Sequence, residues 1–145
     1  MSVTNFNVAN IDITSFRAEP MKETRVEKTL TTEEYIRKYF SDKPILAEVA
    51  RCESRFRQVG KDGDTLVGVV NSSDKGVMQI NEYYHGERSG ALGFDIHTLE
   101  GNAKYARYLF DKEGLKPWNS SSKCWKQTQA YRDFADGVYL LAINQ

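Results

Sequence analysis

The sequence has few of the residues that mark whole classes of protein. It contains only two cysteines and three prolines among 145 residues, which excludes a disulfide-rich miniature scaffold and a proline-rich linker protein. No stretch approaches the roughly twenty apolar residues that cross a membrane. The first ten residues also lack a basic start followed by an apolar run. We therefore expect neither a membrane span nor a signal peptide in this chain.

The sequence also lacks an excess of charge of either sign. Twenty basic residues balance twenty acidic ones. A strong basic excess would favour nucleic acid or an anionic membrane surface as the main partner, and there is none. We expect that any polymer bound by this chain is recognised locally.

The hydrophobic pattern predicts several amphipathic helices. Thr31 followed by Glu34 has the spacing of a capping box that starts a short helix. A second helix is expected to begin with Asp42 as its N-cap and Pro44 in its first turn. A third is expected from a Thr98 cap to about Lys112, with Gly114 after it as the stop.

Between the second and third helices the pattern changes to that of strands. Residues 65–70 are rich in valine, and residues 77–80 follow after a turn-forming stretch. This predicts a small antiparallel β-hairpin. The fold class expected is therefore α+β, mainly α.

At 145 residues with 40% hydrophobic content, the chain is expected to form one domain. Residues 1–30 are polar and irregular and are interpreted as an arm or linker. Residues 31–125 carry the helices and the hairpin. Residues 126–145 have the spacing of a last amphipathic helix packed on this body.

Glu53 is the most informative residue of the second helix. It follows Leu46, Val49 and Ala50 on one stripe, at offsets 0, 3, 4 and 7. A carboxylate at the edge of a core is either half of a structural ion pair or a poorly solvated acid suited to proton transfer. Helical glutamates are usually surface residues, so the second alternative depends on the motifs around it.

Three short motifs follow one another along the chain: Glu53-Ser54-x-Phe56, Gly76-Val77-Met78-Gln79-Ile80 and Asn102-x-x-Tyr105-x-x-x-Leu109. Each alone is a weak signal, but three in order with fitting spacing are fairly specific. Together they resemble the catalytic domain of the soluble lytic transglycosylases, in the lysozyme-like superfamily, over about residues 32 to 125. The resemblance implies a lysozyme-like fold with the hairpin beside the active-site helix.

The resemblance also implies roles for individual residues. In that family the glutamate of the first motif is the catalytic acid and then the base, which places this role on Glu53. The serine and the glutamine position the sugar and the acid, which maps onto Ser54 and Gln79, and the matching tyrosine is Tyr105. The implied reaction breaks the β-1,4 bond between N-acetylmuramic acid and N-acetylglucosamine in peptidoglycan. It closes the sugar's C6 hydroxyl into a 1,6-anhydro ring with one carboxylate, and it needs no cofactor or metal.

Three further side chains are candidates for contact with the glycan strand: Asn81, Tyr84 and Trp118. Aromatic residues at such places also pack at the edge of a core, and that alternative stays open. The family's usual Ala-Tyr-Asn-Ala-Gly block is absent. A segment that contains Trp118, Cys124 and Trp125 stands in its place, so the functional tyrosine of that block has no counterpart.

Cys52 and Cys124 lie far apart and do not have the spacing of metal ligands. Two buried thiols and a disulfide are equally compatible with the sequence. The substrate implied by the resemblance lies outside the cytoplasm. It therefore favours the disulfide and an extracytoplasmic location, in the cell wall, the periplasm or the medium. On the chain-entropy model such a bridge stabilises the fold by about 4 kcal/mol.

Other functions remain open at this point. A hydrolytic lysozyme uses a second acid, and the sequence offers Asp62, Asp64 and Asp74, although aspartate also forms turns. A non-catalytic glycan-binding module of lysozyme-like fold is a further alternative. The enzyme is expected to act as a monomer, in a bacterial host or as a phage-borne wall-degrading domain.

Overall fold

The computed structural model describes residues 28–143. The predicted arm at residues 1–30 therefore falls almost entirely outside the described residues. Within them the chain is mainly helical, with one small antiparallel sheet, which confirms the α+β, mainly α class.

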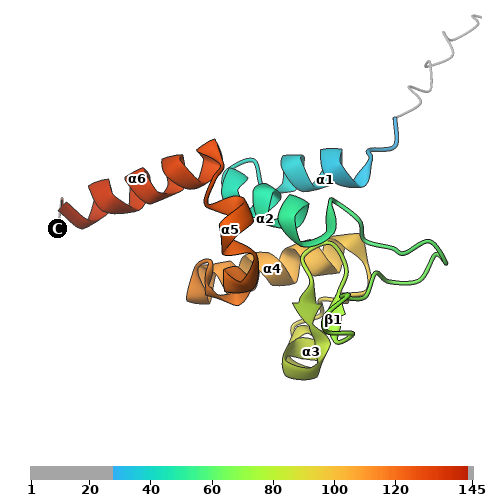
Figure 1. Cartoon of the computed structure of the whole chain (residues 1–145). Coiled ribbons are helices and arrows are strands. Elements are labelled where there is room, and N and C mark those ends of the chain that lie inside the picture. The colour runs from blue at the N-terminus through green and yellow to red at the C-terminus, as the bar shows by residue number, and fades with distance from the viewer. Residues whose placement is uncertain (1–27, 144–145) are drawn as a thin grey trace, which may run out of the picture.

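The elements in chain order are α1 (Thr32–Tyr39), α2 (Pro44–Ser54), β1 (Asp74–Lys75), β2 (Ile80–Asn81), α3 (Glu82–Ala91), α4 (Leu99–Glu113), the 3₁₀ helix η2 (Lys116–Ser121), α5 (Ser122–Trp125) and α6 (Gln129–Ile143). Figure 1 shows α3 and the small sheet at one end of the molecule, with α6 extending from the other.

Helix α2 is the centre of the fold. It contacts α1, η2, α5 and α6, and Leu46, Val49 and Ala50 on its apolar stripe are fully buried. Burial of such side chains contributes roughly 1.5–3 kcal/mol each for the larger ones. Because Glu53 lies on the same stripe one turn further on, packing of α2 also fixes the position of its carboxyl.

Two predicted helix starts are confirmed and one is wrong. Thr31 and Glu34 form the capping box of α1, and Thr98 caps α4. The N-cap of α2 is Lys43, without a side-chain cap, because Asp42 instead accepts a hydrogen bond of 2.8 Å from Arg107 on α4. A charged guanidinium is a stronger donor for this carboxylate than the backbone amides of the helix.

The predicted hairpin is shorter and differently placed than the sequence indicated. Residues 65–70 form no strand and make only isolated bridges at Thr65 and Val67, and residues 77–79 lie in a turn. Val69 and Val70 are fully exposed, so the β-branched run has no sheet face to pack on. The two strands instead pair Asp74 with Asn81 and Lys75 with Ile80.

Two buried amides hold the turn between the strands. Gln58 accepts a hydrogen bond from the backbone of Val77, and Asn102 accepts one from the backbone of Met78, both at 2.9 Å. Gly76 has φ +70, and a Cβ there would lie 2.5 Å from Asn102 and 2.6 Å from Gln58. The glycine of the second motif is therefore required by close approach as well as by its backbone angle.

Cys52 on α2 and Cys124 on α5 form a disulfide, with their Cα atoms 6.0 Å apart. The predicted pairing is thus confirmed. The bridge fastens the residue before Glu53 to the segment that follows η2.

Candidate active site

Glu53 lies in the last turn of α2 and is half-buried. None of the ion pairs formed by residues 28–143 includes it, so it is not part of a structural ion pair there. Its carboxyl oxygen Oε1 accepts a hydrogen bond of 2.6 Å from the hydroxyl of Ser121. Burial raises the pKa of Glu53, the hydrogen bond from Ser121 lowers it in part, and the negative charge of Asp74 raises it further.

Two adjoining cavities meet at Glu53. Their volumes are about 280 Å³ and about 450 Å³. Both are lined by Glu53, Asp74, Gln79 and Ser120. Glu53 therefore lines both cavities, and we call the two together the groove.

The small sheet supplies the wall opposite α2. Gln79 has a positive φ of 50° and donates a hydrogen bond of 2.9 Å to the carbonyl of Gly76. Asn81 caps α3 and donates a hydrogen bond of 2.8 Å to Asp74. The predicted site residues Gln79 and Asn81 thus lie in the groove beside a second carboxylate.

The three candidate aspartates differ in position. Asp74 lines both cavities, whereas Asp62 and Asp64 are exposed and line neither. Asp62 instead accepts a hydrogen bond from the backbone of Asp64, as in a turn. The structure therefore singles out Asp74 from the three.

The predicted tyrosines occupy different places. Tyr84 lines the smaller cavity with 74% of its surface exposed. Tyr105 is only 1% exposed and does not line either cavity, but its hydroxyl lies 3.1 Å from Nδ1 of His85, which does line the groove. Tyr84 is thus placed to contact a ligand, and Tyr105 to support His85.

Ser54 and Trp118 are almost completely buried and support the wall of the cavities. Ser54 is 2% exposed and its hydroxyl donates a hydrogen bond of 2.8 Å to the carbonyl of Val77. Trp118 is also 2% exposed; it borders the smaller cavity, and its ring nitrogen donates to the carbonyl of Met78 at 2.9 Å. Both side chains tie neighbouring segments to the Val77–Met78 turn and so fix the groove.

The contact of Ser121 with Glu53 was not predicted from the sequence. Three serines in a row precede Lys123 and Cys124, and no local pattern shows which of them contacts Glu53. The buried amides of Gln58 and Asn102 were also missed as supports of the wall. Asn102 belonged to the third motif, so a signal existed for it, while Gln58 had none.

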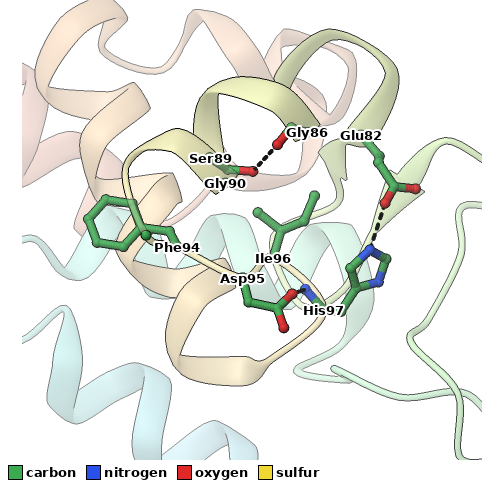
Figure 2. Close-up of a pocket in the computed structure, with 9 residues that line it drawn as sticks. Glu82, Gly86, Ser89, Gly90, Phe94, Asp95, Ile96 and His97 are labelled. Carbon is green, nitrogen blue, oxygen red and sulfur yellow. Dashed lines mark hydrogen bonds and ion pairs between the residues drawn. The ribbon is translucent and has the colours of Figure 1, made fainter.

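A different cavity, of about 370 Å³, lies beside α3 and the loop that follows it. Figure 2 shows Glu82 and His97 paired at its edge, with Oε1 and Nε2 2.6 Å apart. Nζ of Lys75 lies 3.7 Å from Oε2 of Glu82, and Oγ1 of Thr65 lies 3.1 Å from Nδ1 of His97. These contacts join the loop that follows α3 to the small sheet. Their role is therefore structural.

Neither a metal cluster nor a membrane span is found in residues 28–143. No three His, Cys, Asp or Glu side chains there are grouped to hold a metal ion. No helix among these residues is long and apolar enough to cross a membrane.

Comparisons of the chain with protein-family models, with curated proteins and with solved structures found no significant match. The groove and its carboxylates are therefore the basis for a functional proposal.

Proposed function

We propose that this chain is a lytic transglycosylase that cleaves the β-1,4 bond between N-acetylmuramic acid and N-acetylglucosamine in peptidoglycan, with Glu53 as the catalytic acid. The observation that carries the proposal is the carboxyl of Glu53, which lines both adjoining cavities, is poorly solvated and is outside any ion pair among the described residues. The substrate class rests on the resemblance of the three motifs.

The chemistry requires a proton donor and then an acceptor at one place. Glu53 gives its proton to the glycosidic oxygen as the bond from C1 to that oxygen breaks, and the bonding electrons leave with the oxygen. The C6 hydroxyl of the same sugar then attacks C1, and its proton passes to the Glu53 carboxylate. The products are a 1,6-anhydro sugar and a free hydroxyl, and Glu53 is again protonated.

The raised pKa of Glu53 supports the first of these steps, because an acid must still carry its proton near neutral pH. The open groove on both sides of Glu53 supports a polymeric substrate. Amide side chains at Gln79 and Asn81 offer hydrogen bonds to sugar substituents, and the exposed ring of Tyr84 offers an apolar face.

Hydrolysis is the second candidate, and the position of Asp74 favours it. In a hydrolytic lysozyme the second carboxylate positions water or attacks C1, and the product has an ordinary reducing end. Asp74 shares both halves of the groove with Glu53 and is hydrogen-bonded by Asn81. Two carboxylates in different surroundings suit the two parts of that mechanism.

The disulfide between Cys52 and Cys124 supports an oxidising location, in the wall, the periplasm or the medium. A non-catalytic glycan-binding module would not need the desolvated acid at position 53.

Mass spectrometry of the fragments released from purified peptidoglycan tests the proposal, with the Glu53→Gln protein as the control. Anhydro-muropeptides made only by the wild type support a lytic transglycosylase. Reducing-end fragments support hydrolysis with Asp74. A folded wild-type protein that binds glycan strands but releases nothing would show a binding module instead.

A further inference from the structure

We propose that Ser121 is the positioning residue of Glu53: its hydroxyl holds one carboxyl oxygen, so that the other oxygen presents the proton to the substrate. This inference rests on the proposed role of Glu53 as an acid. The residue comes from the segment that stands where the family's Ala-Tyr-Asn-Ala-Gly block is absent.

The contact between the two side chains is short and specific. The Ser121 hydroxyl lies 2.6 Å from Oε1 of Glu53 and 3.2 Å from the carbonyl oxygen of Trp118. A hydroxyl has one proton to donate, and the nearer acceptor is the carboxyl. Among residues 28–143, Ser121 makes the one hydrogen bond to this carboxyl, and it reaches Oε1 alone.

The consequence concerns which oxygen of the neutral acid carries the proton. A protonated carboxyl has one oxygen that accepts and one that donates. In the arrangement in which Oε1 accepts the hydrogen bond from Ser121, the proton of the neutral acid is on Oε2. The oxygen that donates the proton is therefore fixed before the substrate binds.

The surroundings of Ser121 hold it in place. It ends η2, and the ring nitrogens of Trp118 and Trp125 donate to the carbonyls of Met78 and Trp118 respectively. The disulfide joins the residue before Glu53 to Cys124, three residues after Ser121. Donor and acceptor are therefore carried by two segments that are covalently joined.

The neighbouring serines provide the comparison. Ser120 is exposed and lines both cavities. Ser122 lines neither of them and starts α5. Ser122→Ala is therefore a matched control for Ser121→Ala, with the same atom removed one residue away.

Other charged or titratable groups also face the groove: Asp74 on β1, Tyr84 and His85 on α3, Glu113 on α4 and Arg57 after α2. Asp74 is the one whose charge acts on Glu53, and it raises the pKa of that carboxyl. All five are unchanged in a Ser121 variant. Loss of the hydroxyl removes a contact that lowers the pKa of Glu53, so the pKa must rise.

The first test titrates the Glu53 carboxyl by ¹³C NMR, assigned with Glu53→Gln. We expect an upward shift of its pKa in Ser121→Ala, no shift in Ser122→Ala, and a titration like that of the wild type in Ser121→Thr, which keeps the hydroxyl. Identical titrations of wild type and Ser121→Ala overturn the proposal. This readout does not require activity, so a wild type that cleaves nothing refutes the proposed function separately.

The second test measures cleavage against pH. We expect kcat of Ser121→Ala to fall about tenfold, as for loss of a hydrogen bond to a charged group, with KM nearly unchanged. The decline of activity at high pH should move to higher pH, because the acid keeps its proton longer. Loss of activity with no displacement of that decline overturns the positioning role, since a merely structural defect would leave the pH profile in place.

Discussion

Glu53 and Glu82 both line cavities of the described structure, but their carboxyl groups have opposite surroundings. Glu53 is desolvated and contacts a hydroxyl, and the nearby charge that acts on it is that of Asp74, of the same sign. Oε1 of Glu82 lies 2.6 Å from Nε2 of His97, and its Oε2 lies 3.7 Å from Nζ of Lys75.

The difference shows what separates the carboxyl proposed as the acid from a structural one. Both carboxyl oxygens of Glu82 are engaged by basic side chains, one by His97 and the other by Lys75. Burial and the nearby charge of Asp74 raise the pKa of Glu53, which favours the protonated form that an acid needs. The partners in the folded chain decide this, since both residues are glutamates at ends of helices.

The largest expected effect comes from removing the two carboxyl groups in turn. We expect Glu53→Gln to lower the rate of peptidoglycan cleavage about a thousandfold, because the transferable proton is lost. Glu82→Gln should stay within about a factor of two of the wild type, because it removes a half-exposed ion pair. Release of soluble fragments measures both, and equal losses in the two variants would contradict the distinction.

The Glu53 region is fastened covalently, whereas the Glu82 region is joined by polar contacts. Replacing both Cys52 and Cys124 by alanine should lower the free energy of unfolding by about 4 kcal/mol, because the bridge closes a long loop whose ends are 72 residues apart. Urea unfolding measures it, with the wild type in reducing agent as the parallel sample. An unchanged midpoint would show that the bridge contributes nothing.

Removing the charge beside Glu53 sharpens the comparison further. Asp74 raises the pKa of Glu53, so Asp74→Asn should lower that pKa and move the high-pH decline of activity to lower pH. We expect about a tenfold loss of rate at neutral pH, as for other electrostatic contributions in active sites. Asp64→Asn, at an exposed position outside both cavities, is the control. A loss as large as that of Glu53→Gln would give Asp74 a direct part in the chemistry, as in hydrolysis.

The smallest effect concerns stability. The pKa of Glu53 is raised in the folded chain above its ordinary value of 4.5. Its contribution to stability is therefore fully present below the unfolded pKa and is lost as the pH rises through the folded pKa. Glutamine stays neutral, so Glu53→Gln should raise Tm by about 3 °C at neutral pH and should leave Tm unchanged in acid.

The same melting experiment on Glu82→Gln provides the contrast. Loss of its pairing with His97 should leave Tm unchanged or slightly lower at neutral pH. A higher Tm in both variants would mean that Glu82 is also held in an unfavourable place.

Several parts of the fold were predictable from the sequence because they depend on local rules. The caps at Thr31 and Thr98 follow from side-chain hydrogen bonds to nearby amides, and both predictions were confirmed. The predicted cap at Asp42 was wrong, because Arg107 on a distant helix binds the same carboxylate. The valine-rich run at residues 65–70 was predicted as a strand from its composition, but its three valines are exposed and have no sheet face to pack on.

The candidate site also has some features that follow from local sequence rules and others that depend on distant contacts. The stripe of α2 placed Glu53 at the edge of the core, and the motif around Gly76 placed Gln79 near it. The choice of Asp74 among three candidate aspartates and of Ser121 among three serines was not predictable, since both depend on how distant segments meet.

The sequence by itself determined the class of the fold, the longer helices α2, α4 and α6 and the residues able to do chemistry, because helix periodicity, capping and side-chain type act over a few residues. It did not predict α3, η2 or α5. Only the tertiary structure decided that Glu53 is shielded from solvent, is near the charge of Asp74 and accepts a hydrogen bond from Ser121. Those properties depend on burial and on contacts across 68 residues of chain between Glu53 and Ser121, and no local pattern encodes them.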